Sequence, residues 1–120
     1  MTLDDLRGVR GLIYAASPYT SYIWGRSSAA YDATRHAEHL MSEGFEVFSP
    51  VSYFHPIARV SKVDETAHDF WLQRCRPFMD AAIALVIVKL PGWEISRGIA
   101  EEAAYFQAAG KPVVEMEPLP

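Results

Sequence analysis

The chain has 120 residues, of which 50% are hydrophobic, and a formal net charge of −4 from 11 basic and 15 acidic residues. This length suits one domain with its own core, so we expect a single domain over residues 1–120. No cluster of Lys and Arg supplies the positive surface of a dedicated nucleic-acid binder. Cys75 is the single cysteine, which excludes an internal disulfide and favours a reducing compartment.

The apolar segments are too short to insert into a membrane. The longest apolar run, Ala81–Val88, is far shorter than the ~20 residues that a spanning helix needs. The first ten residues, MTLDDLRGVR, carry acidic side chains where a signal peptide carries basic ones. We therefore expect a soluble, cytoplasmic protein with no membrane partner.

The first fifty residues predict a strand, a helix and a second strand. Arg10–Ala16 is a short apolar run that predicts a buried strand, and Ser17-Pro18 stops it. Ser27–Glu43 has the helical period, with Gly44 where a C-terminal glycine belongs. Phe45–Phe48 predicts a second, brief strand. The apolar stripe of the helix is expected to consist of Ala30, Ala33, Ala37, Leu40 and Met41.

The middle of the chain predicts a loop and a short helix. Val51–Val63 is rich in aromatic residues and is expected to be an irregular loop, which at this length is more often functional than idle. Asp64 is expected to cap a helix that runs to about Cys75, because Pro77 should end or kink it at Arg76.

The last third of the chain completes an alternating pattern. Ala81–Leu90 lacks polar alternation, as expected of a strand that is covered on both faces. Ser96–Ala109 predicts a helix closed by Gly110, and Lys111–Met116 predicts the last strand. The order β-α-β-α-β-α-β is typical of an α/β three-layer sandwich, a doubly wound, mostly parallel sheet of four or five strands of the flavodoxin or Rossmann type.

The fold class predicts where a ligand binds. In doubly wound sheets, ligands bind outside the carboxyl ends of the strands. Those ends are expected at Tyr14–Tyr19, Phe48–Tyr53 and Leu90–Gly98. No Cys/His set has zinc spacing, and we interpret His36 and His39 as part of a solvated helix face rather than a metal site. No metal and no organic cofactor is expected.

Two adjacent carboxylates lie in the last expected helix. At about 100° per residue, Ile99, Ala103 and Phe106 define its buried stripe. Glu102 lies at the edge of this stripe, whereas Glu101 lies nearly opposite, in solvent. A buried carboxylate is rare without a partner or a function. Glu102 is therefore either a catalytic candidate or a core-margin residue that reaches a backbone N–H or an arginine.

Ser96-Arg97-Gly98 opens the same helix, after the longest expected strand. Backbone N–H groups at a helix start, together with a serine hydroxyl, form an anion site. The alternative is that Ser96 simply caps the helix. Asp69 and Asp80 have plain alternatives as well, a solvated or paired charge for Asp69 and a turn residue for Asp80.

A set of spaced motifs covers nearly the whole chain, from Ile13 to Val114. The motifs are Tyr14 within IYAA, Asp69 with Trp71-Leu72, Asp80 before the hydrophobic strand, S-x-G-x-x-x-E from Ser96 to Glu102, Tyr105, and Gly110-Lys111. Together they resemble the nucleoside 2-deoxyribosyltransferase superfamily. The phrases ASPYT and LPGW-x-x-S-x-G look closest to a bacterial branch of it that is described only as domains of unknown function.

The resemblance implies roles for three residues. The glutamate that matches Glu102 is the nucleophile that attacks the anomeric carbon of a 2-deoxyribosyl group, so that the base leaves and a covalent glycosyl-enzyme forms. The tyrosine that matches Tyr14 hydrogen-bonds and orients this glutamate. The aspartate that matches Asp69 lies by the nucleobase and assists its departure. The resemblance also implies a symmetric homodimer or a larger homo-oligomer.

Two departures from the superfamily pattern favour a nucleotide as substrate. Transferases that use free nucleosides have an aspartate six residues before the nucleophile, which holds the sugar 5′-hydroxyl, and this chain has Ser96 there. Deoxynucleoside 5′-monophosphate N-hydrolases have a serine there, because a carboxylate would repel a phosphate. Transferases also use an asparagine near the C-terminus, and this chain contains no asparagine.

These departures favour an N-glycosidase that acts on 2-deoxyribonucleoside 5′-monophosphates. The alternatives are a deoxyribosyltransferase on free nucleosides and a catalytically silent nucleotide-binding module. The expected substrate-binding residues are Ser17, Pro18, Ser96 and Gly98 around the phosphate, Arg26 or Arg97 as its charge partner, and Trp24, Tyr53 or Trp93 stacked on the base.

Overall fold

The computed structural model describes residues 1–64 and 67–120 and contains one all-parallel sheet. Its strand order is β2-β1-β3-β4. The strands are β1 (Leu12–Ala16), β2 (Glu46–Phe48), β3 (Ala82–Val88) and β4 (Val113–Met116). Their carboxyl ends meet at one edge of the sheet, because all neighbouring strands pair in parallel. The fold is the expected flavodoxin-like α/β sandwich, with four strands.

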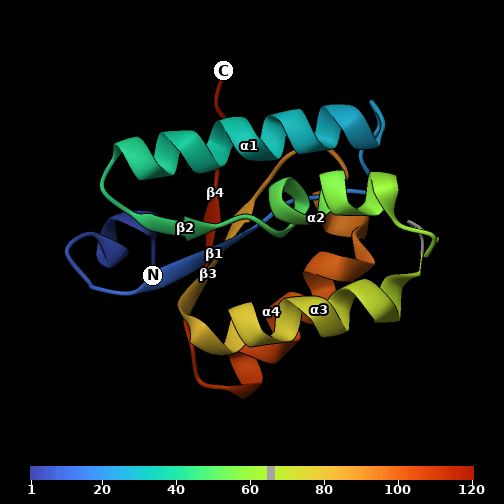
Figure 1. The fold of residues 1–120 in the computed structure, drawn as a ribbon. Helices are drawn as coiled ribbons and strands as arrows, with labels where there is room; N and C mark the ends of the chain where they lie inside the picture. Colours follow the sequence, from blue (N-terminus) through green and yellow to red (C-terminus); the bar gives the residue numbers. More distant parts are fainter. Residues whose placement is uncertain (65–66) are drawn as a thin grey trace.

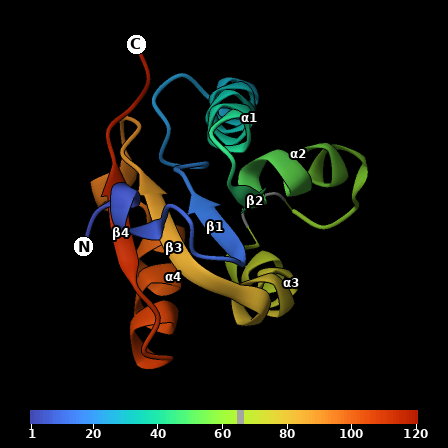
Figure 2. The ribbon, with the colours of Figure 1, turned by 90° about the vertical axis from the view of Figure 1, so that its left-hand side faces the viewer.

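Helices cover both faces of the sheet. Figure 1 shows α1 above the strands and α3 with α4 below them, and Figure 2 shows the same layers from the side. The helices are α1 (Arg26–Ser42), α2 (Pro50–Val60), α3 (His68–Ala81) and α4 (Arg97–Ala108), with 3-10 turns η1 (Leu3–Leu6) and η2 (Trp93–Ile95). No helix of the described residues has the length and apolar character needed to cross a membrane.

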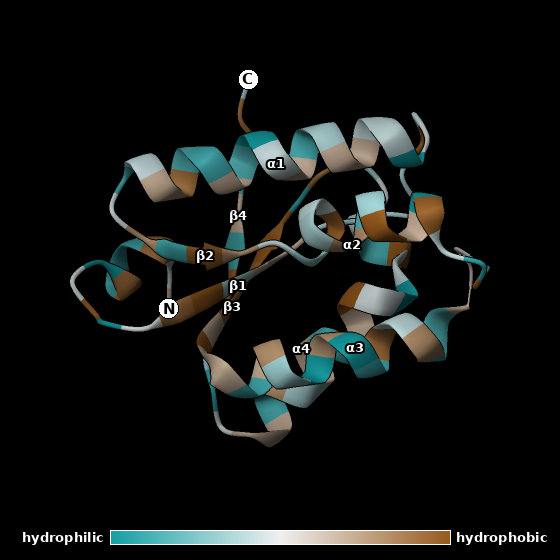
Figure 3. Cartoon of the chain, viewed as in Figure 1, coloured by the Kyte–Doolittle hydropathy of each residue, from teal (hydrophilic) through white to brown (hydrophobic). Residues whose placement is uncertain are grey.

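Two apolar clusters form the core, one on each face of the sheet. On the α1 face, Ile13 and Val86 of the strands pack with Ala33 and Leu40 of the helix. On the other face, Leu85 packs with side chains of α3 and α4. Every residue of β3 except Ile83 is buried, which confirms the prediction of a strand covered on both sides. Figure 3 shows β3 as brown along most of its length, whereas α1 changes between teal and brown.

The segment expected as an irregular loop is instead mostly the helix α2. The Ser49 side chain caps this helix by accepting a hydrogen bond from the backbone N–H of Ser52, and Pro50 occupies its first turn. A serine before a proline both stops a strand and starts a helix, because proline at the first helical position has no N–H to lose. The sequence-based prediction interpreted Ser49-Pro50 only as the end of a strand. In addition, Pro56, which lies inside α2, obscured the helical periodicity of this segment.

The helix α3 begins later and ends later than expected. Its N-cap residue is Ala67 rather than Asp64, and the backbone carbonyl of Asp64 accepts the Trp71 indole N–H. Residues 65 and 66, part of the expected first turn, lie outside the described residues. Pro77 does not end the helix at its predecessor, because α3 continues to Ala81. The buried side chain of Met79 holds this last turn against the core.

The helix α1 buries Ala33, Ala37 and Leu40 of the expected stripe, but the edge of the stripe is shifted. Its buried residues are Ala29, Ala33, His36, Ala37 and Leu40, whereas the expected stripe residue Met41 is exposed. His36 is therefore not part of a solvated face. It lies in the core, and its neighbour His39 is partly exposed. Gly44 ends the helix in a left-handed conformation (φ 96°), as expected.

Candidate active site

A pocket of about 350 Å³ lies at the edge where the strands end. The residues after β1 contribute Ser17, the start of α2 contributes Pro50, and the start of α4 contributes Ser96 with Gly98. Each of the three segments expected to meet a ligand thus lines this pocket. The helices α2 and α3 form much of the remaining wall.

Glu102 lines the pocket and is bonded to Tyr14. The Glu102 side chain is only 7% exposed, and the Tyr14 hydroxyl donates a short hydrogen bond to its Oε2. Tyr14 projects from β1 and is fully buried between the rings of Phe48 and Phe106. Tyr14 is the hydrogen-bond partner of Glu102 among the described residues. The alternative of a margin glutamate that reaches a backbone N–H or an arginine is therefore not what the structure shows.

Burial sets the electrostatics of this pair. It raises the pKa of the Glu102 carboxyl from 4.5 to about 7, against the lowering effect of the Tyr14 hydrogen bond, and the nearby charge of Glu101 adds to the rise. Burial and the Glu102 charge raise the pKa of Tyr14 well above 10, so that this hydroxyl stays a donor. Burial also raises the pKa of the adjacent Cys75 thiol to about 12, so this pocket residue is uncharged at neutral pH.

The start of α4 offers free donors to the pocket. The Ser96 hydroxyl accepts a hydrogen bond from the N–H of Ile99, so Ser96 caps the helix. The N–H groups of Arg97 and Gly98 have no hydrogen-bond partner among the described residues. The Ser17 hydroxyl, buried in the same pocket, also has none within that part of the chain. Capping and anion binding are thus compatible here.

Asp69 lies outside the pocket lining. Its side chain is 82% exposed, and its carboxylate pairs with an Arg97 nitrogen at 3.4 Å. The residue before it, His68, lines the pocket and bonds to Glu101. The position of Glu101 on its helix predicted a side chain in solvent. The structure instead shows it paired and only partly exposed. It accepts from both His68 and Arg97, and the hydrogen bond from His68 is the main cause that lowers its pKa.

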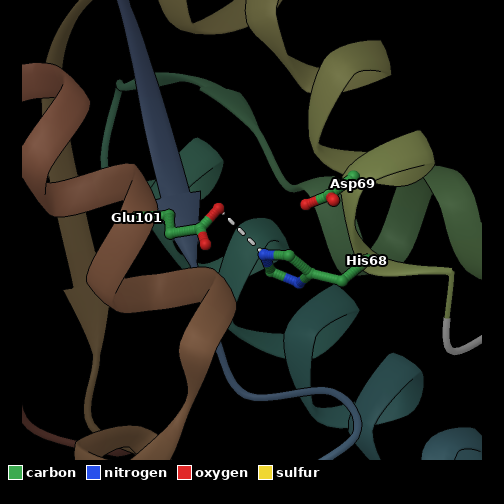
Figure 4. A group of neighbouring side chains, drawn as sticks. All are labelled: His68, Asp69 and Glu101. Carbon is green, nitrogen blue, oxygen red and sulfur yellow. Dashed lines mark hydrogen bonds and ion pairs between the residues drawn. The ribbon is translucent and has the colours of Figure 1, made fainter.

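His68, Asp69 and Glu101 form a group that metal ions can use. Figure 4 shows the three side chains converging from α3 and α4, and one ligand atom from each lies within 4.8 Å of the others. Arg97, however, already pairs with both carboxylates, at 3.4 Å and 3.1 Å. The Arg97 guanidinium thus supplies positive charge to both carboxylates of this cluster.

The sequence belongs to one recognised family. Residues 11–118 match the family described as Domain of unknown function (DUF1937). The chain is a DUF1937 domain. No curated protein matches it. The family carries no assigned activity, so the site of this DUF1937 domain is interpreted from its own residues.

The aromatic residues expected to stack on a base lie elsewhere in this DUF1937 domain. Within the described residues, none of Trp24, Tyr53 and Trp93 lines the pocket. Phe54 and Trp71 line it instead, with ring centroids 6.1 Å apart. Of the other expected binding residues, Pro18 is fully buried and Arg26 opens α1, and neither belongs to the pocket lining of the described residues.

Three residues of the sequence motifs, Asp80, Tyr105 and Lys111, connect elements of the scaffold. The Tyr105 hydroxyl donates to the Asp80 carboxylate at 2.5 Å, which connects α4 to the last turn of α3. The Lys111 ammonium donates to the backbone carbonyl of Asp80 at 2.9 Å. Neither Asp80 nor Tyr105 lines the large pocket of the described residues. Their spacing in the sequence reflects contacts between α3, α4 and the start of β4.

Sequence reasoning missed two pocket histidines, His55 and His68. His55 lay in the segment taken for a loop. His68 could have been found from the helical period, because it shares a face with other pocket residues at spacings of three, four and seven. This face consists of His68, Trp71, Leu72 and Cys75.

Proposed function

We propose that this DUF1937 domain is an N-glycosidase that cleaves the base–sugar bond of 2-deoxyribonucleoside 5′-monophosphates through a covalent glycosyl–Glu102 intermediate. The observation that carries the proposal is the buried Tyr14–Glu102 pair in the wall of a pocket at the carboxyl ends of the strands. The motif spacing that resembles the nucleoside 2-deoxyribosyltransferase superfamily supports the same residues. No metal and no organic cofactor is needed for this reaction.

The proposed first step uses the Glu102 carboxylate as nucleophile. Glu102 attacks the anomeric carbon while the glycosidic C–N bond breaks, and Tyr14, which binds Oε2, leaves the other carboxylate oxygen for the attack. In a site that excludes water, the electrostatic attraction between a carboxylate and the sugar is strongest in the transition state, when positive charge develops on the sugar. Because Glu102 must be ionised and its pKa is about 7, activity should rise as the pH increases through about 7.

The start of α4 is suited to hold the 5′-phosphate. A helix N-terminus attracts anions through its free N–H groups and its dipole. Such donors around one pocket are the N–H groups of Arg97 and Gly98 and the buried Ser17 hydroxyl, which has no hydrogen-bond partner among the described residues. Arg26 stays a prediction as a second charge partner of the 5′-phosphate. Asp69 stays a predicted contact to the base, at the rim.

Ser96 and the absence of asparagine favour hydrolysis of nucleotides over transfer between free nucleosides. An aspartate at position 96 would place its carboxylate beside the N–H groups of α4 that are proposed to bind the phosphate, and it would repel that phosphate. A homodimer remains part of the proposal, because exposed apolar side chains such as Trp24, Tyr31 and Val60 offer interface area. Light scattering at tens of micromolar tests this point, and a monomer would contradict it.

The test of the proposed function is a panel of deoxynucleosides and their 5′-monophosphates, followed for free base by chromatography. Each charge-assisted hydrogen bond to phosphate contributes roughly 1.5–3 kcal/mol. Two such bonds should favour the monophosphate in kcat/KM by well over tenfold. Ser96→Asp should flatten or invert this preference, whereas Glu38→Gln, on the exposed outer face of α1, should leave it unchanged.

Three other outcomes contradict the proposal in distinct ways. Equal kcat/KM for nucleosides and monophosphates would restore the transferase alternative. Transfer of the sugar to a second base at the expense of hydrolysis would do the same. Binding of nucleotides without any turnover would identify a silent binding module.

A further inference from the structure

The pocket contains a histidine that has no role in the step described above. His68 begins α3, lines the pocket together with Glu102, and keeps 23% of its side chain exposed. The adjacent Asp69 is 82% exposed and pairs with Arg97 outside the pocket lining. Of these two neighbours, His68 is the one whose side chain reaches the pocket.

Glu101, on the neighbouring helix α4, holds the ring of His68 in one orientation. Its Nε2 lies 2.9 Å from Glu101 Oε2, and Arg97 Nε holds the other Glu101 oxygen at 3.1 Å. The hydrogen bond from His68 and the contact to Arg97 both lower the pKa of Glu101, so this carboxylate is ionised and can only accept. Nε2 therefore carries a hydrogen. The second nitrogen, Nδ1, is turned away from Glu101 (Figure 4).

A carboxylate that accepts a hydrogen bond from one imidazole nitrogen holds the ring in a fixed orientation and leaves the second nitrogen for proton transfer. The same arrangement orients catalytic histidines in other hydrolases, where it fixes the tautomer and makes the outer nitrogen a proton donor and acceptor. The second pocket histidine, His55, lacks such support. Its Nδ1 lies 2.7 Å from the Tyr19 hydroxyl, which is a neutral partner.

We propose that His68, oriented by Glu101, is the general acid that protonates the departing base, and then the general base that activates water. This inference rests on the proposed function and assigns its proton transfers. Glu102, Tyr14 and Cys75 are not suited to this task. Glu102 forms the bond to carbon, and the hydroxyl of Tyr14 and the thiol of Cys75 have pKa values too high for proton exchange near neutral pH.

In the two proposed steps, each bond that forms at the anomeric carbon is matched by one that breaks, and His68 moves the proton. The Glu102 carboxylate forms a bond to the anomeric carbon, the C–N bond breaks, and its electron pair stays on the base nitrogen system. The Nδ1 proton of His68 moves to the base, which leaves neutral. A water molecule then attacks the anomeric carbon, His68 takes one of its protons, and the carbon–Glu102 bond breaks. The enzyme returns to its first state, and the products are free base and 2-deoxyribose 5-phosphate.

The test uses a substrate whose leaving group needs no proton. Wild type and variants are compared on the deoxynucleoside 5′-monophosphate that wild type cleaves fastest, and on 4-nitrophenyl 2-deoxyribofuranoside 5-phosphate, with spontaneous hydrolysis subtracted. General acid catalysis contributes about 10²–10⁴-fold. His68→Gln should therefore lose at least about 10²-fold in kcat/KM on the nucleotide and less than about threefold on the nitrophenyl substrate.

Three variants control this comparison. Glu101→Gln removes the charge behind His68 and should lose about tenfold on the nucleotide alone, as expected of a positioning residue. His55→Gln is the matched pocket variant, and it should change both substrates by the same factor. Asp69→Asn removes only the predicted contact to the base at the rim, so it should lose far less on the nucleotide than His68→Gln does. Turnover of the nitrophenyl substrate shows that each variant is folded.

Several results would overturn the inference. An equal loss on both substrates for His68→Gln would give this histidine a structural role, as a contact between α3 and α4. A loss specific to the nucleotide in Asp69→Asn but not in His68→Gln would make Asp69 the acid. If wild type cleaves neither substrate, the proposed function fails together with this inference. If wild type cleaves both and only the His68 result fails, the proposed function stands.

Discussion

Among the described residues, each face of the sheet buries one histidine or carboxylate side chain, and the surroundings of the two differ. On the α1 face, His36 is fully buried, and both ring nitrogens are bonded. Nδ1 lies 2.7 Å from the Asp32 carbonyl, and Nε2 accepts the N–H of Leu119 at 3.0 Å. On the other face, Glu102 has Tyr14 as its one hydrogen-bond partner within the described part of the chain, and it lines a pocket.

This difference distinguishes a structural group, His36, from a group that we propose to act in catalysis, Glu102. A buried polar group with every partner in place stabilises the fold. A buried carboxyl with one partner and a pocket in front of it is destabilised as an anion, which the rise of its pKa to about 7 expresses. His36 should therefore stabilise the fold and have no role in catalysis, whereas the ionised Glu102 should serve catalysis and lower the stability of the fold.

The largest expected effect is on catalysis by Glu102. Glu102→Gln keeps the shape of the side chain and the hydrogen bond from Tyr14 but cannot attack carbon. Loss of a nucleophile should lower kcat for base release by at least about 10³-fold. His36→Ala, measured on the folded fraction, should retain kcat within about threefold. Comparable losses in both variants would remove the distinction.

The second effect is on stability and concerns His36. His36→Ala leaves a cavity beneath α1 and removes the acceptor of the Leu119 N–H, so the free energy of unfolding should fall by about 2–4 kcal/mol. Urea unfolding of wild type and variant measures this change. His39→Ala, on the partly exposed side of the same helix, is the matched control and should lose less than about 1 kcal/mol. An unchanged midpoint in His36→Ala would contradict the structural role.

The smallest expected effect is a pH-dependent gain in the free energy of unfolding when Glu102 is replaced by glutamine. The pKa of Glu102 is about 7 in the folded chain, against 4.5 as the ordinary value. Between these values the folded state holds a proton that the unfolded state releases, so wild-type stability falls as pH rises through this window. Glu102→Gln escapes this fall. It should be more stable than wild type by about 2–3 kcal/mol at pH 8, and nearly equal to it at pH 4.5.

Urea midpoints at the two pH values test this prediction. A variant that is less stable than wild type at pH 8 would mean that the ionised Glu102 is well compensated in the fold. The carboxylate would then be a structural group like His36.

Much of this arrangement could be predicted from the sequence. Apolar runs bounded by Ser-Pro and Gly signals located the strands, because burial on two faces leaves little freedom in composition. The phase of α4 placed Glu102 inward, since the buried residues Ile99 and Phe106 define the stripe without ambiguity. The pocket edge followed from the parallel topology.

The remainder depends on contacts between elements that local patterns do not encode. Ser49-Pro50 reads both as a strand stop and as a helix start, and only packing against α1 shows that α2 forms. Glu101 lies opposite the buried stripe of its own helix, yet α3 brings His68 onto it. His36 is polar and lies in the core, because Leu119, 83 residues away in the chain, supplies its second partner.

The central claim is that Glu102 forms a covalent bond with the sugar, and mass spectrometry can test it directly. The probe is a 2-deoxy-2-fluoroarabino nucleoside 5′-monophosphate, whose fluorine slows hydrolysis of the glycosyl-enzyme by destabilising the positive charge on the sugar. Wild type should gain the mass of one fluorinated sugar phosphate, on the peptide that contains Glu102, and Glu102→Gln should gain none. Release of the base without an adduct, or with an adduct on another residue, would contradict the account.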